Sequence, residues 1–345
     1  MGSSSLRPGT GCSLPSGAGN EGKAVNPDVT PGSPPVRGLK LRFLGTGAEN
    51  ADPSRAESST LVSCGELRML VDVGRGSIMR LAQSGVGVGE ITAVLLTHLH
   101  LDHVAELPSL IRIGWTERAE PLRIIGPAGT HDMVSGIVGG AFRRSFRSDR
   151  AYLAWLDGGT GLADPPPLIV TDLEPDEQLE VAPLIVRAAK TEHGGSLFDL
   201  EDWVCLAYRI EHAGIAVAFS GDTGWSDDLV QLARDADLLA QNCYCSHHEA
   251  SGVLDQIEAE RFFATGSVAG RLAADAGVGH LVLTHFGLGA DMNRALAEAA
   301  EHFPGQITLA ADHMSVSLEP SNGRGARSHI LVDPASDARG EASRG

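Results

Sequence analysis

The stretch Thr97-His98-Leu99-His100-Leu101-Asp102-His103 decides how the rest of this chain is interpreted. It directly follows Ala93-Val94-Leu95-Leu96, a short apolar run typical of a strand that is buried on both faces. Alternate residues of an extended segment can point the same way, so the first two histidines can face one partner. Asp102 and His103 then begin a helical pattern. Imidazole and carboxylate groups without a thiolate suit Zn, Fe or Mn, so the stretch predicts a metal site at this strand end.

The same ligand types recur where three later apolar runs end, at His193, Asp222 and His285. Strand ends of packed sheets gather along one edge, and the loops at such an edge often carry functional residues. Taken alone, each of these residues is typical of an ordinary surface loop. Taken together with the first cluster, they predict ligands that converge in space.

Short β-rich runs alternate with helical patterns between residues 38 and 320, which indicates one continuous domain. The expected strands are 39–44, 59–62, 67–73, 93–96, 122–125, 179–186, 204–210, 215–219, 238–240, 280–283, 307–310 and 315–318. The expected helices are 77–83, 104–113, 130–140, 227–234, 257–276 and 293–302. Two sheets packed face to face with helices outside would bury these elements. We therefore expect an α/β fold, an αββα sandwich of two mixed β-sheets flanked by helices.

Both ends of the chain differ in composition from this domain. Residues 1–37 and 321–345 are rich in Gly and Ser and poor in large apolar side chains. Such segments bury too little surface to offset the entropy lost on ordering. We expect a flexible N-terminal arm and a flexible C-terminal tail, with room in the tail for a short strand at His329-Ile330-Leu331-Val332.

The charge balance and the cysteine count limit the partners and the compartment. The chain has 345 residues, with 27 Lys or Arg and 44 Asp or Glu, so the formal net charge is −17. Nucleic-acid affinity rests largely on cationic side chains, so this balance argues against a nucleic-acid partner, although charge can be local. No run reaches the roughly 18 apolar residues of a membrane span, and the opening residues show no apolar signal segment. We therefore expect no membrane association. The five sparse cysteines do not form a disulfide framework, so we expect a cytoplasmic location.

This pattern resembles the metallo-β-lactamase superfamily over about residues 39–318. The resemblance is carried by Leu70-Val71-Asp72-Val73-Gly74, by the cluster His98-x-His100-x-Asp102-His103, and by the three later ligand types in the family's order. It implies two metal ions, each with three ligands of its own: His98, His100 and His193 for one, and Asp102, His103 and His285 for the other. Asp222 would bridge both ions, and Asp72 would support the metal loop from behind it. The implied cofactor is two Zn²⁺ ions, with Mn or Fe as alternatives.

Three further stretches are similar to the branch that holds ribonuclease Z, cyclic phosphodiesterases and arylsulfatase-like enzymes: Phe43-Leu44-Gly45-Thr46-Gly47, Ile125-Gly126-Pro127-Ala128-Gly129 and Leu283-Thr284-His285-Phe286. The branch implies a dinuclear metal-dependent hydrolase in which a metal-bridging hydroxide attacks an ester bond. Asp102 and Asp222 would fix the metals and orient the proton of the nucleophile. We expect a small-molecule ester as substrate, foremost a phosphodiester or an aryl sulfate. The branch also suggests a homodimer.

Two departures from ribonuclease Z count against tRNA 3′ processing. Only 28 residues lie between His193 and Asp222, where long-armed ribonuclease Z proteins carry a basic arm. Phe263 stands where that family has a catalytic histidine, and a phenyl ring cannot protonate a leaving group. His247 and His248 follow a predicted strand, and we take them as catalytic candidates in its place.

Other functions stay open. Carboxyl esters, lactones and thioesters suit the same hydroxide, because only the pocket distinguishes these substrates. A biosynthetic enzyme could use the same metals for a rearrangement. A non-catalytic metal-binding scaffold is a further alternative, which the complete ligand set disfavours.

A local basic patch interrupts the acidic composition, formed by Arg143, Arg144, Arg147 and Arg150. Such a cluster is typical of a solvated helix face, and the alternative is contact with an anionic substrate group. Trp115, Tyr152 and Trp155 flank the patch, and for these aromatic residues core packing is the default expectation.

Overall fold

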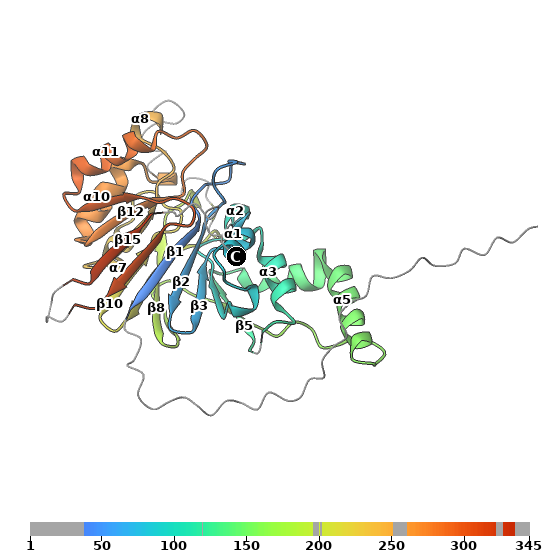
Figure 1. Ribbon diagram of the computed structural model, residues 1–345. Coiled ribbons are helices and arrows are strands. Elements are labelled where there is room, and N and C mark those ends of the chain that lie inside the picture. The colour runs from blue at the N-terminus through green and yellow to red at the C-terminus, as the bar shows by residue number, and fades with distance from the viewer. Residues whose placement is uncertain are drawn as a thin grey trace, which may run out of the picture. The chain divides into compact units, whose positions relative to one another are not determined.

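The computed structural model describes residues 38–118, 120–195, 200, 202–250, 261–321 and 327–334. The described chain forms two β-sheets that pack face to face, with helices outside them (Figure 1). The predicted αββα sandwich of two mixed sheets is confirmed. None of the described helices combines the length and the apolar character that crossing a bilayer requires. The arm predicted at residues 1–37 lies outside the described residues.

The first sheet has eight strands in the order β15-β14-β1-β2-β3-β4-β5-β6. Its strands are β1 (Leu39–Gly45), β2 (Ser59–Cys64), β3 (Leu67–Val71), β4 (Ala93–Leu95), β5 (Leu122–Gly126), β6 (Leu168–Asp172), β14 (Ser315–Glu319) and β15 (His329–Asp333). Strands β3 to β6 run parallel, so their carboxyl ends lie at one edge. Strand β15 lies within the segment expected to be a tail, at the stretch with room for a strand, and pairs antiparallel with β14.

The second sheet has seven strands in the order β13-β12-β11-β10-β9-β8-β7. Its strands are β7 (Gln178–Val181), β8 (Leu184–Thr191), β9 (Cys205–His212), β10 (Ile215–Phe219), β11 (Leu238–Asn242), β12 (His280–Thr284) and β13 (Gln306–Leu309). Strands β10 to β13 run parallel. The single strand predicted over 179–186 is wrong, because the chain turns at Ala182-Pro183 and β7 pairs antiparallel with β8. Proline lacks the amide hydrogen that a continuing ladder needs.

The described helices are α1 (Ser77–Gln83), η1 (Val88–Glu90), α2 (Leu101–Val104), α3 (Leu107–Gly114), α4 (Thr130–Ser135), η2 (Gly136–Ala141), α5 (Arg143–Leu156), α7 (Asp227–Leu232), α8 (His247–Ala250), α10 (Gly266–Ala276) and α11 (Met292–His302). Helices α1 and α3 share an apolar core with the first sheet. Helices α7, α10 and α11 share one with the second sheet. At Gly270, α10 approaches α11 so closely that a Cβ would collide with the carbonyl oxygen of Ala299.

Three helix predictions differ from the structure. The helix expected over 104–113 is divided into α2 and α3, because Pro108 fits only the first turn of a helix. The helix expected over 257–276 is not continuous in the described residues, because α10 begins only at Gly266. The side chain of Thr265 caps the start of α10 by accepting from the amide of Val268. Helix α5 was not among the expected helices, although its arginine cluster was interpreted as typical of a solvated helix face.

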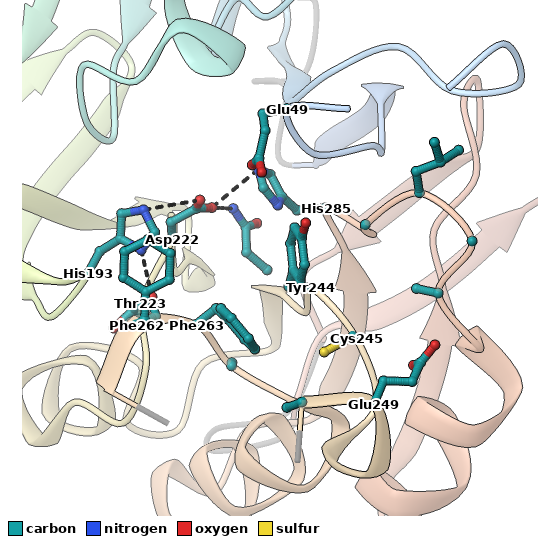
Figure 2. A pocket seen from close by; sticks show the side chains of 17 residues that line it. Glu49, His193, Asp222, Thr223, Tyr244, Cys245, Glu249, Phe262, Phe263 and His285 are labelled. Atoms are coloured by element: carbon teal, nitrogen blue, oxygen red, sulfur yellow. Dashed lines mark hydrogen bonds and ion pairs between the residues drawn. The ribbon is translucent and has the colours of Figure 1, made fainter. Parts of the chain in front are cut away.

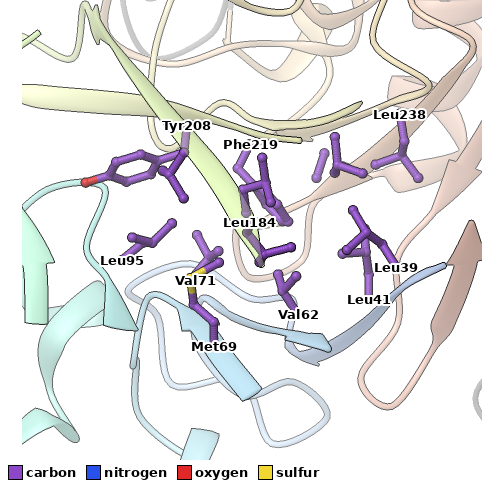
Figure 3. Packing of buried hydrophobic residues seen from close by; sticks show 14 of the residues in the cluster. Leu39, Leu41, Val62, Met69, Val71, Leu95, Leu184, Tyr208, Phe219 and Leu238 are labelled. Carbon is purple, nitrogen blue, oxygen red and sulfur yellow. The ribbon is translucent and has the colours of Figure 1, made fainter. Parts of the chain in front are cut away.

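The space between the sheets is filled by apolar side chains from both (Figure 3). Leu41 and Met69 come from the first sheet and Leu184 from the second, and all three are buried. Tyr208 reaches across, and its hydroxyl donates to the carbonyl oxygen of Leu96 at 2.7 Å. Leu96 immediately precedes the histidine cluster, so this core contact fixes the start of the metal loop.

We predict that Tyr208→Phe lowers the free energy of unfolding by about 1–2 kcal/mol, because it removes a buried hydrogen bond without changing the ring. Urea denaturation measures this difference. The matched control is Tyr152→Phe, since Tyr152 is 55% exposed and its change should stay within about 0.5 kcal/mol. Equal stabilities of the two variants would contradict the anchoring role of Tyr208.

Candidate metal centre and adjoining cavity

Strand ends bring the predicted ligands together where the two sheets meet. The cluster containing His98 follows β4, Asp222 follows β10, and His285 follows β12. His193 follows β8, which runs in the same direction as β10 because both are antiparallel to β9. Residues far apart in the sequence are therefore delivered to one place by the strand order.

The predicted ligands form two groups, and within each group the ligand atoms lie within 4.8 Å of one another: His98, His100, His193 and Asp222 in the first, and Asp102, His103, Asp222 and His285 in the second. Asp222 belongs to both groups. Its Oδ2 lies 3.9 Å from His98 Nε2 and 3.6 Å from His193 Nε2. Its Oδ1 lies 3.5 Å from His103 Nε2 and 3.4 Å from His285 Nε2. One carboxylate oxygen thus faces each group, which is the arrangement that a bridging ligand needs.

The hydrogen bonds behind two imidazoles determine which ring nitrogen faces inward. His193 Nδ1 lies 2.6 Å from the carbonyl oxygen of Phe262, which can only accept, so this nitrogen carries the hydrogen. His103 Nδ1 donates in the same way to Asp72 Oδ2 at 2.8 Å. In the neutral rings, the Nε2 atoms of both histidines therefore present lone pairs to the centre of the cluster.

These inward-facing nitrogens lie close to further imidazole nitrogens. His103 Nε2 is 3.0 Å from His285 Nε2, and His193 Nε2 is 3.2 Å from His100 Nδ1. His98 Nε2 approaches the same atom of His100 at 3.0 Å. Lone pairs that converge at such distances are stable only around a cation or a proton. The donor set therefore fits divalent metal ions, and the mixture of imidazole and carboxylate suits them chemically.

The pKa shifts describe the same demand for positive charge. Burial acts to raise the pKa of Asp222, but His285 and His103 outweigh it and hold this pKa well below its ordinary value. Burial acts to lower the pKa of His103, but Asp72 and Asp222 raise it well above its ordinary value. The buried cluster thus keeps its carboxylates ionised and stabilises a cation among them.

Asp72 holds the metal loop from behind. Its Oδ1 accepts from the amide of Thr97 at 2.8 Å, and its Oδ2 accepts from the hydroxyl of Thr97 at 3.0 Å as well as from His103. Asp72 has a φ of +60° and His285 a φ of +61°, in the left-handed region that non-glycine residues rarely adopt. Backbone of this kind persists only where the surroundings enforce it, and here it aims both side chains at the cluster.

Two supporting residues were missed by the sequence analysis. Asn242 ends β11, and its Nδ2 donates to Asp222 Oδ1 at 2.6 Å. Its position at a strand end beside β10 and β12 was a usable signal. The ring of Trp203 lies 4.6 Å from that of His100, and its Nε1 donates to the carbonyl oxygen of His193 at 3.1 Å. Trp203 lies in a loop, and no motif in the sequence marks it.

A cavity of about 360 Å³ opens beside the cluster. Figure 2 shows His193, Asp222 and His285 on one side of it, with Phe262 and Phe263 nearby. The ionisable side chains that line it besides these ligands are Glu49, Tyr244, Cys245 and Glu249. The cavity therefore combines an apolar, aromatic wall with direct access to the predicted ligands.

The leaving-group side of the site differs from the sequence-based expectation. Phe263 lines the cavity, as its place in the family pattern implies. His247 and His248 lie on α8, and neither is among the described residues that line the cavity. Their backbone amides face the carboxylate of Glu298. The catalytic role expected of these two histidines stays a prediction.

The comparisons with known proteins agree with this geometry. A family model described as a beta-lactamase superfamily domain matches residues 68–286. Ribonuclease Z of Mycobacterium bovis (strain BCG / Pasteur 1173P2) is 34% identical over 297 residues, 82% of this chain and 99% of the relative. Ribonuclease Z of Mycobacterium tuberculosis (strain ATCC 25618 / H37Rv) is 33% identical over the same shares.

Two solved structures share the fold. The metallo-beta-lactamase fold protein YhfI from Bacillus subtilis has a TM-score of 0.62 at 23% identity, over 81% of this chain and 98% of its own. The short form of human tRNase Z has a TM-score of 0.58 at 23% identity, over 80% and 98%. This chain belongs to the metallo-β-lactamase superfamily, in the branch that includes ribonuclease Z. The prediction of a metal-dependent hydrolase that acts on ester bonds is confirmed.

The predicted substrate and partner are wrong. The sequence analysis favoured a small-molecule ester and argued against nucleic acid, whereas relatives that align over 82% of this chain are named ribonuclease Z. The charge argument failed because the net charge of −17 is a sum that does not say where the cations lie. The short spacing after His193 and the phenyl ring of Phe263 remain, but neither removes a ligand.

We predict that the purified protein binds two equivalents of divalent metal, and that His193→Ala and His285→Ala each lower this to about one. Each substitution removes one imidazole from a different group. Elemental analysis after gel filtration measures the stoichiometry. His131→Ala is the control, because the His131 side chain is 66% exposed. Unchanged stoichiometry in both site variants would contradict the assignment of the two groups.

Proposed function

We propose that this protein is an endoribonuclease of the ribonuclease Z type, which cleaves the phosphodiester bond between a tRNA and its 3′ extension. The observation that carries the proposal is the 34% identity over 99% of a named ribonuclease Z. The convergence of all seven predicted ligand residues supports it. The likeness to human tRNase Z, at 23% identity, concerns the fold alone.

We propose zinc as the metal, with two ions per chain. Five imidazoles, two carboxylates and no thiolate make up the two groups, a set that suits zinc, with manganese and iron as alternatives. When bound, such a pair of ions supplies Lewis-acid chemistry, because it lowers the pKa of water and neutralises phosphoryl charge. The expected homodimer and cytoplasmic location stay predictions.

The protein's own residues contribute position and environment. The carboxylate of Asp222 is held by Asn242 and faces both groups at once, so it sets their separation. Asp72 keeps the hydrogen of His103 on Nδ1 and thereby leaves Nε2 directed inward. Burial of the cluster limits screening by bulk water, which would strengthen the attraction between bound metal ions and a phosphate group.

The aromatic wall of the cavity suits nucleotide bases beside the scissile bond. The ring of Phe262 stacks on that of His193, with centroids 4.5 Å apart and planes at 29°. Phe263 packs against Tyr244, with centroids 5.1 Å apart. Stacking between bases and aromatic side chains is strong and tolerates different sequences, as a substrate with varied 3′ extensions requires.

We predict that the metal-loaded protein cuts a precursor tRNA transcript at the start of its 3′ extension, and that Asp222→Asn lowers this rate at least about a hundredfold. Gel analysis of end-labelled RNA measures both. Asp132→Asn is the matched control, because the Asp132 side chain is 97% exposed. Hydrolysis of bis(p-nitrophenyl) phosphate without any cleavage of precursor tRNA would contradict the proposed function.

We predict that Phe263→His raises kcat for precursor tRNA about tenfold at pH 6 and leaves it nearly unchanged at pH 8. An imidazole donates a proton only while it is protonated, below a pKa of about 6.5, so the gain should fade as the pH rises. Phe263→Leu is the control for loss of the ring. A pH-independent change shared by both variants would mean that the added imidazole does not act as an acid.

A further inference from the structure

Helix α5 is basic within an acidic protein. Its 14 residues contain four arginines against one aspartate, a net charge of +3, while the whole chain carries −17. The aspartate, Asp149, is already paired with Arg112 of α3, with Oδ2 and Nε 2.6 Å apart. Arg143, Arg144 and Arg147 are exposed and take part in no ion pair within the described part of the chain. These three guanidinium groups are therefore available to a polyanion.

The same helix exposes aromatic rings. Trp155 is 68% exposed and Tyr152 is 55% exposed, so the expectation that these two residues pack in the core is wrong. Their ring centroids lie 6.1 Å apart with planes at 25°, which makes a small stacked platform. Phe146 is the buried residue of α5, and it packs 6.2 Å from the ring of Trp115. An exposed tryptophan beside a tyrosine is typical of a contact surface.

Two of the exposed arginines and both rings of the aromatic platform share one side of the helix. With 3.6 residues per turn, Arg144 and Trp155 fall opposite Phe146, and Arg147 and Tyr152 lie on either side of them. Figure 1 shows α5 at the periphery of the molecule, beyond α3 and away from the sheets. The charged and aromatic groups are therefore presented outward together.

The helix is held firmly at its other side. Besides the pair formed by Asp149 and Arg112, Arg150 Nε donates to the carbonyl oxygen of Ala163 at 2.6 Å, and the amide of Ala163 donates back to the carbonyl oxygen of Arg150 at 3.0 Å. Together with buried Phe146, these contacts fix the orientation of α5. Less conformational entropy is lost when such a preorganised surface binds a ligand.

We propose that the outer side of α5, formed by Arg144, Arg147, Tyr152 and Trp155, is a docking surface for the RNA substrate. The arginines would contact phosphates and the rings would stack on unpaired bases. The proposal rests on the proposed function for the identity of the RNA. It assigns substrate binding to a segment that precedes His193. The basic arm of long-armed ribonuclease Z proteins lies instead between the positions of His193 and Asp222, where this chain has only 28 residues.

Charge and geometry favour RNA over two other occupants. A second copy docked symmetrically on α5 would oppose arginines with arginines, because a twofold interface places the same patch against itself. A helix lying on a membrane separates its basic and apolar sides, whereas Arg144, Arg147 and Trp155 share one side here. RNA uses both kinds of group on the same surface.

The test measures binding of mature tRNA, which has no extension to cleave, to the metal-loaded full chain by fluorescence anisotropy at several salt concentrations. We expect Arg144→Glu/Arg147→Glu to raise Kd at least about tenfold and to reduce the salt slope by about one per arginine. We expect Trp155→Ala to raise Kd about five- to a hundredfold with little change of slope. Turnover of bis(p-nitrophenyl) phosphate should stay the same in all variants.

The matched control is Lys40→Glu/Arg234→Glu, an equal charge change at two exposed residues on β1 and beyond α7. The proposal would be overturned if this control weakened tRNA binding as much as the α5 variants do. It would also be overturned if both α5 variants bound tRNA with the affinity of the wild-type protein. The proposal would also be overturned if the α5 variants bound tRNA as the wild type does but sedimented differently, which would indicate a second copy as the occupant. The same holds if they bound tRNA normally but lost binding to phosphatidylglycerol vesicles, which would indicate a membrane. Binding through α5 without cleavage of precursor tRNA would leave the docking surface standing and refute the proposed function. Cleavage of precursor tRNA at equal KM in all variants would support the proposed function and refute the docking surface.

Discussion

The structure depends on the convergence of imidazole lone pairs and carboxylates around Asp222. His103 and His193 have their Nδ1 hydrogens fixed from behind, so their Nε2 atoms turn toward neighbouring nitrogens 3.0–3.2 Å away. Such an arrangement is repulsive without positive charge in its middle. A buried site of this kind is stable when divalent cations occupy it, and the surrounding fold holds the donors in place for them.

The fold produces this convergence through strand direction. Parallel strands in both sheets end at the same edge, and the residues that follow β4, β10 and β12 meet there. The core between the sheets fixes the loop through the bond from Tyr208 to Leu96. The left-handed backbone at Asp72 and His285 is the local strain that the packed surroundings sustain.

The sequence was sufficient to predict the sandwich and the residues that converge in two groups, because both leave local patterns. Apolar runs of strand length ended in ligand residues, and the cluster around His98 is compact enough to recognise. Trp203 could not be predicted, since its contact with His100 arises only in the folded chain. The arginines of α5 were visible in the sequence as a basic patch, but a net charge of −17 argued against nucleic acid because it averages over a helix that carries +3. The substrate depends on loops and surfaces that one sequence does not shape.

A hydrolytic centre in a cavity and a basic, aromatic helix at the periphery form a consistent picture of an enzyme for a long polyanion. Under the proposed function, the cavity would take the scissile phosphate and its neighbouring bases, and α5 would hold the body of the substrate. The central claim is the pair of cations on either side of Asp222. Anomalous diffraction from crystals grown with zinc tests it most directly. The account predicts two peaks, one in each of the two ligand groups that share Asp222, and a single peak or peaks outside these groups would contradict it.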